Sequence, residues 1–222
     1  MSVRYSCLYI ADIDRPSQED QYVHRVELRE KTTRCRISAL PTSLSVTPDG
    51  WNVVFTCNAE RKVVEYTTHG ELIREFRLDD EFVNFTHPIR LRESRDGQFG
   101  IYHSDYSDTL NRVCVVGSDG CAFSFYGGTP GSDAEQQRVP IRLVEYTNGS
   151  ILVLNMFNRR VLLLNESLVC LKTLAARNDN HSNNRPWYPL RMCLDVVRGN
   201  LLGECERHCT DDRILLFQLA SM

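Results

Sequence analysis

The sequence is poor in lysine, which occurs only at Lys31, Lys62 and Lys172, so arginine supplies almost all of the positive charge. Arginine is the cation best suited to two parallel hydrogen bonds with a phosphate or carboxylate, although a codon bias in the source genome would give the same excess. The formal net charge of -3 argues against a surface built wholly for nucleic acid, and it leaves room for a local basic face.

Long apolar segments are missing too. No stretch approaches the roughly 18 uninterrupted apolar residues of a membrane span, and the opening MSVRYSCLYI contains no apolar signal-peptide core. The nine cysteines include no C-x-x-C pair, which indicates reduced thiols. Cys205 and Cys209 form the only cluster, without a second pair at zinc-finger spacing, so we expect no metal site and no cofactor. These absences predict a cytoplasmic protein that does not bind a membrane.

An internal repeat is the strongest positive signal. Five segments place an apolar run after a basic residue: HRVEL, RKVVEY, NRVCVV, RRVLLL and DRILLF. Four others begin with a proline (Pro41, Pro88, Pro140 and Pro189) and end in a turn with a glycine, as in PTSLSVTPDG and PIRLVEYTNG. Two sets that recur in step, roughly every 40 to 50 residues, indicate repeated structural units.

Within one unit the pattern is that of strands. Apolar runs of four to eight residues, rich in Val, Leu, Ile and aromatic residues, are separated by Asn, Asp and Gly, as in hairpin-connected strands. Four strands per unit predict an all-β fold, a β-propeller that forms a single domain over residues 1–222. The predicted units are 1–40 (partial), 41–87, 88–139, 140–188 and 189–222 (partial).

Three segments, LYIADIDRPSQEDQYVHRVEL, DGWNVVFTCNAERKVVEY and NGSILVLNMFNRRVLLLN, resemble the NHL repeat. The resemblance implies a propeller of four-stranded blades like the C-terminal part of tripartite-motif (TRIM) proteins. The RING, B-box and coiled-coil segments of those proteins do not occur in this sequence, and a RING upstream would make the full-length protein a ubiquitin ligase.

Propellers of the NHL family usually have six blades. This chain supplies three strands of a first unit, three full units and three strands of a last unit. Because an open ring would expose unpaired strand edges, we expect a missing segment or a partner chain to complete an incomplete six-bladed ring.

The order of strands in a blade sorts its loops onto two faces. Short turns such as TPDG and SDG connect the first strand to the second and the third to the fourth. The opposite face, the long-loop face, carries the second-to-third-strand loops and the loops between blades. Function tends to sit on long, irregular loops held by a rigid scaffold. We therefore predict a recognition platform, without catalytic activity, that binds a protein, a peptide or single-stranded RNA through the long-loop face.

Three arginines follow their prolines by two residues, and we expect them to lie where the innermost strands begin, in an arc on the long-loop face. Together with aromatic residues of the loops they make up the predicted binding set: Arg90, Arg142, Arg191, Arg159, Tyr106, Phe157, Trp187, Tyr188 and His87. Guanidinium groups beside aromatic rings suit single-stranded RNA. The same arginines can instead serve the scaffold through ion pairs between blades, with Glu93, Glu145 and Asp195 as the candidate acids.

An alternative is a hydrolase or lyase with a metal in the central channel, as in the lactonases and an amidating lyase built on related repeats. That chemistry needs carboxylates, asparagines or histidines converging on one ion. The predicted innermost strands offer mainly leucine and valine, and the histidines show no ligand spacing. No nucleophile elbow, phosphate loop or H-E-x-x-H motif occurs.

Overall fold

The structure is a computed structural model that describes residues 2–4, 7–11, 21–27, 32–37, 41–47, 50–82, 84–91, 97–104, 110–128, 140–146, 149–155, 158, 160–176, 187–195, 200–207 and 213–218. In several strands, among them those after residue 186, the description covers the backbone alone. The chain comprises two compact units, Met1–His103 with Val115–Phe123 and Ser104–Cys114 with Ser124–Met222. Within the described residues no helix is long and apolar enough to cross a membrane.

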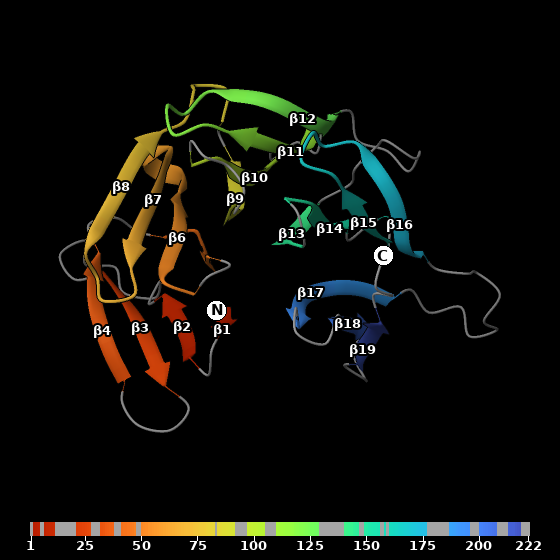
Figure 1. The fold of residues 1–222 in the computed structure, drawn as a ribbon, viewed down its shortest axis with the longest axis horizontal. Coiled ribbons are helices and arrows are strands. Elements are labelled where there is room, and N and C mark those ends of the chain that lie inside the picture. The colour runs from red at the N-terminus through yellow and green to blue at the C-terminus, as the bar shows by residue number, and fades with distance from the viewer. Residues whose placement is uncertain are drawn as a thin grey trace. The chain divides into compact units, whose positions relative to one another are not determined.

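The first unit holds two complete antiparallel sheets (Figure 1). Sheet 1 runs in the order β1 (Ser2–Arg4), β2 (Cys7–Ala11), β3 (Gln21–Glu27) and β4 (Thr32–Ile37). Sheet 2 runs in the order β5 (Ser43–Val46), β6 (Asn52–Cys57), β7 (Lys62–Thr67) and β8 (Leu72–Arg77), with a short 3-10 helix, η1 (Asn58–Glu60), between β6 and β7. Sheet 1 therefore has four strands where the sequence predicted three, because Ser2–Arg4 pairs with β2.

Sheet 3 has strands in both units and runs in the order β9 (Asn84–Arg90), β10 (Phe99–Ser104), β11 (Asn111–Val116) and β12 (Ala122–Gly128). In the second unit, sheet 4 runs in the order β13 (Pro140–Glu145), β14 (Ile151–Asn155), β15 (Arg160–Leu164) and β16 (Cys170–Ala176). Sheet 5 has three strands among the described residues, β17 (Trp187–Asp195), β18 (Asn200–Arg207) and β19 (Arg213–Gln218), as the sequence predicted.

The third-to-fourth-strand turn is the same in three sheets. The N–H groups of Gly70, Gly120 and Leu168 donate to the carbonyl groups of Thr67, Gly117 and Asn165, and all three donors have positive φ, of 92°, 85° and 59°. Glycine adopts this conformation without a steric penalty. Leu168 does not, but its side chain is buried, so packing holds the strained residue in place.

Each unit has a core between strands with buried apolar runs. In the first unit, Val23 and Ile37 of sheet 1 pack with Phe55 and Tyr66 of sheet 2, whose rings stack with centroids 5.3 Å apart. Cys57 belongs to the same core, and burial, more than the nearby Glu60, raises the pKa of its thiol to about 12. In the second unit, residues of β14 and β15 form the corresponding cluster: Leu152, Leu154, Val161 and Leu163.

Sheets 2 and 3 meet within the first unit through aromatic contacts. The rings of Phe76 and Phe99 lie 5.1 Å apart, and those of Phe82 and His103 lie 4.7 Å apart. Gly120 lies so close to the backbone of β8 that a Cβ atom there would sit 1.8 Å from the carbonyl oxygen of Arg77. This junction positions the polar site described next.

Candidate functional site

The structure places Arg90 at the opposite end of its strand from the one the sequence suggested. We predicted that Arg90 opens the innermost strand of its unit, but β9 begins at Asn84 and ends at Arg90. The backbone N–H of Leu91 then donates to the carbonyl group of Gln98, which closes the turn to β10. Arg90 therefore lies at the end of the sheet that carries the short hairpin turns, which we call the hairpin-turn end.

The other two arginines of the predicted arc occupy matching places in their strands, each just after a β-bulge that separates it from its proline. Arg142 is the third residue of β13, and it pairs with Leu154, the last residue but one of β14. Arg191 is the fifth residue of the longer β17 and pairs with Glu204. Arg142 and Arg191 therefore hold equivalent positions, but Arg90 ends its strand, so the three arginines do not form the regular arc expected from the proline spacing.

The remaining predicted residues are described in part or not at all. His87 lies inside β9, and Trp187 and Tyr188 open β17, so the backbone of all three belongs to strands where loops were expected. Tyr106, Phe157 and Arg159 lie outside the described residues. A binding role for this set remains a prediction.

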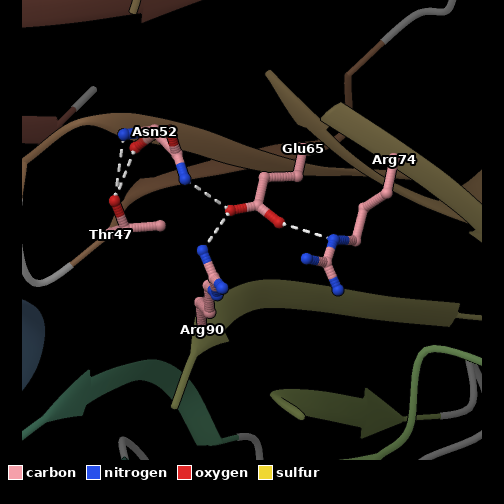
Figure 2. A network of polar contacts seen from close by, with 5 residues as sticks. All are labelled: Thr47, Asn52, Glu65, Arg74 and Arg90. Atoms are coloured by element: carbon pink, nitrogen blue, oxygen red, sulfur yellow. Dashed lines mark hydrogen bonds and ion pairs between the residues drawn. The ribbon is translucent and has the colours of Figure 1, made fainter. Parts of the chain in front are cut away.

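A carboxylate buried in sheet 2 is the partner of Arg90. Glu65 of β7 has a side chain with no solvent exposure, and its Oε1 accepts hydrogen bonds from Arg90 Nη1 and Asn52 Nδ2, each at 2.8 Å. Its Oε2 lies 3.0 Å from Nε of Arg74, the residue opposite Glu65 on β8. Figure 2 shows the carboxylate between the two guanidinium groups. An ion pair between sheets 2 and 3 does hold Arg90, as the scaffold interpretation proposed, but its acid is Glu65.

Neighbouring backbone fixes this network at the hairpin-turn end. The hydroxyl group of Thr47 bonds with the backbone N–H and C=O of Asn52, the first residue of β6 (Figure 2). Gly97, in the turn from β9 to β10, leaves room for Arg74, since a Cβ atom there would lie 2.3 Å from Nη1. The hydroxyl group of Ser45 donates to the carbonyl group of Pro88 and so joins β5 to β9. Strands of two sheets therefore hold both arginines.

Glu65 is a charged residue at a position where other repeats have an aliphatic residue. The local sequence does not identify the partners of its carboxylate. When the third strands are aligned on Val63, Val113 and Val161, the residues at the position of Glu65 are Val115 and Leu163, and both are buried. An aliphatic residue thus satisfies the scaffold in two other sheets. Burying an ionic group instead carries a desolvation penalty, so the network is not required by the repeat itself.

The described residues offer little for metal-dependent chemistry. The innermost strands and the residue that follows β9 place Leu44, Leu91 and Leu143 in buried positions. Within the described part of the chain, no three His, Cys, Asp or Glu side chains gather at a spacing that would hold a metal ion. Glu93, one of the candidate acids named above, lies outside it.

Large apolar side chains remain exposed on the outermost strands. Ile73, Phe123 and Leu171 each follow the positive-φ residue of the repeated turn by three positions, and 39%, 55% and 56% of their surfaces are exposed. The equivalent position is therefore apolar and solvent-facing in three successive sheets. Sequence reasoning missed it because the third-to-fourth-strand turns were interpreted as turn chemistry alone.

Comparison with solved structures decides the fold. A protein of unknown function from Bacteroides thetaiotaomicron VPI-5482 superposes with a TM-score of 0.63 at 14% identity, covering 91% of this chain and 55% of that one. A nidogen/laminin complex gives a TM-score of 0.55 at 13% identity, covering 95% and 78%. These neighbours are propeller-like. The fold is a β-propeller. Sheets 1 to 4 are four-stranded blades, and sheet 5 is a blade with three described strands.

The propeller neighbours differ in what they do. Virginiamycin B lyase from Staphylococcus aureus, an enzyme, has a TM-score of 0.50 at 16% identity and covers 97% of this chain and 71% of that one. Nidogen was solved in a complex with another protein. The chain spans 55% to 78% of the length of these three structures. No protein-family model and no curated protein matches the chain. At these identities the likeness shows the fold alone.

Proposed function

We propose that this propeller is a non-catalytic recognition platform for a protein partner. The observation that carries the proposal is the apolar residue that each of three blades exposes on its outermost strand: Ile73, Phe123 and Leu171. The scaffold does not need apolar side chains there, because 39% to 56% of their surface remains exposed to solvent. Exposed aliphatic and aromatic groups on an otherwise charged surface are typical of protein interaction sites.

A protein partner fits the described arginines better than RNA does. Glu65 offsets one of the two positive charges of Arg74 and Arg90. Arg61 pairs with Asp80 at 2.7 Å. RNA binding needs basic groups that remain available to phosphates along a continuous groove. The long-loop face remains the predicted location of further contacts, with Arg142, Arg191, Trp187 and Tyr188 as its candidates. An NHL-type role in a TRIM-like protein is the form of this function that the repeat pattern suggests.

A metal-dependent hydrolase or lyase has less support. Catalysis at a central metal requires polar ligands on the innermost strands, where Leu44 and Leu143 are buried apolar residues. A rise in melting temperature on addition of calcium would favour this alternative, because a ligand that binds the native state stabilises it.

The test uses one triple variant, Ile73→Glu, Phe123→Glu and Leu171→Glu. Proteins cross-linked to the wild-type chain in cells are identified and purified, and their affinity for each variant is measured. We expect a loss of about tenfold or more, because interface contacts of this kind contribute 1 kcal/mol or more each. The control, Arg77→Glu with Thr173→Glu, adds charge to exposed positions of β8 and β16 while keeping the apolar residues. Equal affinity of both variants would contradict the proposal.

Filter binding of a random single-stranded RNA over a salt series separates the RNA alternative. Salt-sensitive affinity that an Arg90, Arg142 and Arg191 triple alanine variant abolishes would replace the protein partner with RNA. Absence of RNA binding at low salt is the result we expect.

A further inference from the structure

The two arginines that contact Glu65 have further N–H groups that this carboxylate does not bind. Arg74 uses Nε for Glu65, which leaves the N–H groups of Nη1 and Nη2, and Arg90 uses Nη1, which leaves those of Nε and Nη2. Among the described residues no polar partner contacts these remaining nitrogen atoms. The two guanidinium groups lie on the two oxygen atoms of one carboxylate, one on each side of it (Figure 2).

The burial of the three charges is uneven in a way that favours an incoming anion. The side chain of Glu65 is 0% exposed, whereas those of Arg74 and Arg90 are 32% and 28% exposed. Solvent therefore reaches the two arginine side chains but not the carboxylate between them. One negative and two positive charges leave the cluster with one net positive charge, and a preorganised pair of guanidinium groups is suited to bidentate binding of an oxyanion.

We propose that Arg74 and Arg90, oriented by Glu65, form a binding site for a carboxylate group at the hairpin-turn end of blades 2 and 3. The occupant is an aspartate or glutamate side chain of the protein partner, so this inference rests on the proposed function. A carboxylate carries one negative charge and neutralises the cluster, whereas a phosphate dianion would overcompensate it. Glu65 is a positioning residue here, because it holds both arginines and does not touch the ligand.

The break in the repeat supports this assignment. Buried Val115 and Leu163 occupy the equivalent positions in two other blades, so the scaffold does not require an ion at this place. A buried carboxylate is destabilising unless its partners compensate its charge, and here the partners are Asn52 and two arginines that are 32% and 28% exposed. The ionic arrangement is less stabilising than a buried aliphatic residue would be, but it fixes the orientation of two arginine side chains near the surface.

The experiment follows the side-chain Nε–Hε signals of arginine by NMR in the ¹⁵N-labelled full chain at low ionic strength. The signals of Arg74 and Arg90 are assigned with Arg74→Lys and Arg90→Lys variants. Hexaglutamate peptide, acetate and inorganic phosphate are added in separate titrations. We expect saturable shifts of Arg74 and Arg90 with hexaglutamate, weaker shifts in the same direction with acetate, and no comparable shift of Arg77, an exposed arginine on the same strand. Shifts with phosphate and none with hexaglutamate would overturn the carboxylate assignment.

Variants then distinguish geometry from net charge. Arg90→Gln should weaken hexaglutamate binding by about tenfold or more, since a charge-assisted contact is lost, while Arg77→Gln should leave it within about twofold. Glu65→Gln raises the net positive charge by one, so simple attraction would strengthen binding, whereas loss of the orienting carboxylate should weaken it. Tighter binding by Glu65→Gln, or equal losses in Arg90→Gln and Arg77→Gln, would refute the site. The wild-type titration needs no variant, so it stands even if a substitution unfolds the protein.

Failure of this site is distinguishable from failure of the proposed function. If hexaglutamate shifts neither arginine while partner affinity still depends on Ile73, Phe123 and Leu171, the carboxylate site is wrong and the platform stands. If the arginines bind hexaglutamate but the affinity for the protein partner does not depend on the exposed apolar residues, the proposed function is wrong and the carboxylate site stands.

Discussion

Substitution of Glu65 by glutamine tests whether the buried carboxylate holds blades 2 and 3 together. The substitution keeps the shape of the side chain, but it removes the charge and places an N–H₂ group where an oxygen atom accepted a hydrogen bond. Asn52 Nδ2 and Arg90 Nη1 donate hydrogen bonds to Oε1, and Arg74 Nε forms an ion pair with Oε2 at 3.0 Å without hydrogen-bond geometry. At least one of these three contacts must be lost in the variant, because an N–H₂ group cannot accept from a donor.

The expected magnitude follows from burial. Breaking a buried ion pair costs about 3–5 kcal/mol when the remaining charge stays buried and unpaired. Arg74 and Arg90 are each about one-third exposed, so water can hydrate them after the substitution and reduce that cost. We therefore expect Glu65→Gln to lower the free energy of unfolding by about 2–3 kcal/mol.

The assay is urea unfolding monitored by tryptophan fluorescence in a Trp187→Phe background, so that Trp51 of blade 2 reports alone. With a slope of about 2 kcal/mol/M, the unfolding midpoint should fall by about 1 M or slightly more. Glu75→Gln on β8 is the matched control, because its carboxylate is 44% exposed and lies 3.6 Å from Lys62. It should change stability by no more than about 0.5 kcal/mol. Equal midpoint shifts in the two variants would refute the reasoning.

Two further predictions concern a glycine and a thiol. Gly120→Ala should destabilise the protein by about 2–4 kcal/mol in the same urea assay, because at a φ of 85° its Cβ atom would clash with the Arg77 carbonyl oxygen. The control is Gly128→Ala, which has open space around it and should cost only about 1 kcal/mol of backbone strain. Similar losses in the two variants would mean that the contact with β8 is unimportant. Iodoacetamide at pH 8 should modify exposed Cys121 well before Cys57, as measured by peptide mass spectrometry. Burial raises the pKa of Cys57 to about 12 and shields its thiol from the reagent. The negative charge of Asp119 also raises the pKa of Cys121, but that thiol is exposed. The thiol of Cys57 has a pKa of 9.0 in the unfolded chain and about 12 in the folded protein, so only the unfolded chain ionises between these values. The free energy of unfolding should therefore fall progressively from pH 9 to pH 12. In a Cys57→Ala variant this contribution to the fall should be absent.

Strand content and turn positions were accessible from the sequence, because both depend on local patterns. Alternating apolar runs predicted the strands of blades 2 to 4, and β13 begins at Pro140 as the proline spacing suggested. Gly50, Gly97 and Gly149 adopt the positive φ that their turns require. Leu168 occupies the same turn position as Gly70 and Gly120 without any turn signal in its side chain, so that equivalence became visible only in the backbone.

The register of β9 could not be predicted from its proline. We assumed that Pro88 opens a strand, as Pro140 does, yet β9 starts four residues earlier. Proline lacks a backbone N–H and is excluded from central strands, but β9 is the innermost strand and an edge of sheet 3, where an interior proline is tolerated. The proline therefore does not fix the start of the strand, and the error moved Arg90 to the wrong end of the blade.

The partners of Glu65 were out of reach for a different reason. A local pattern can show that a charged residue falls at an apolar position of a strand, but not which charges from other strands meet it. Arg74 is nine residues away along the chain and Arg90 is twenty-five, and they come from two blades. The candidate acids proposed for Arg90 were its sequence neighbours, whereas packing between blades supplied Glu65. Contacts of this kind depend on tertiary structure and not on periodicity.

Repetition in this chain separates what the scaffold requires from what it merely permits. Buried aliphatic residues recur because every blade must fill its core, and positive φ recurs because every third-to-fourth-strand turn has the same geometry. Neither explanation covers Ile73, Phe123 and Leu171, since exposure gives them no core to fill. Nor does it cover Glu65, which replaces a buried aliphatic residue at a desolvation penalty. Features that break local rules without a stabilising reason are expected at functional sites, and here they lie on the strands next to the third-to-fourth-strand turns. Binding studies should therefore begin at the hairpin-turn end and the outermost strands as well as at the long loops.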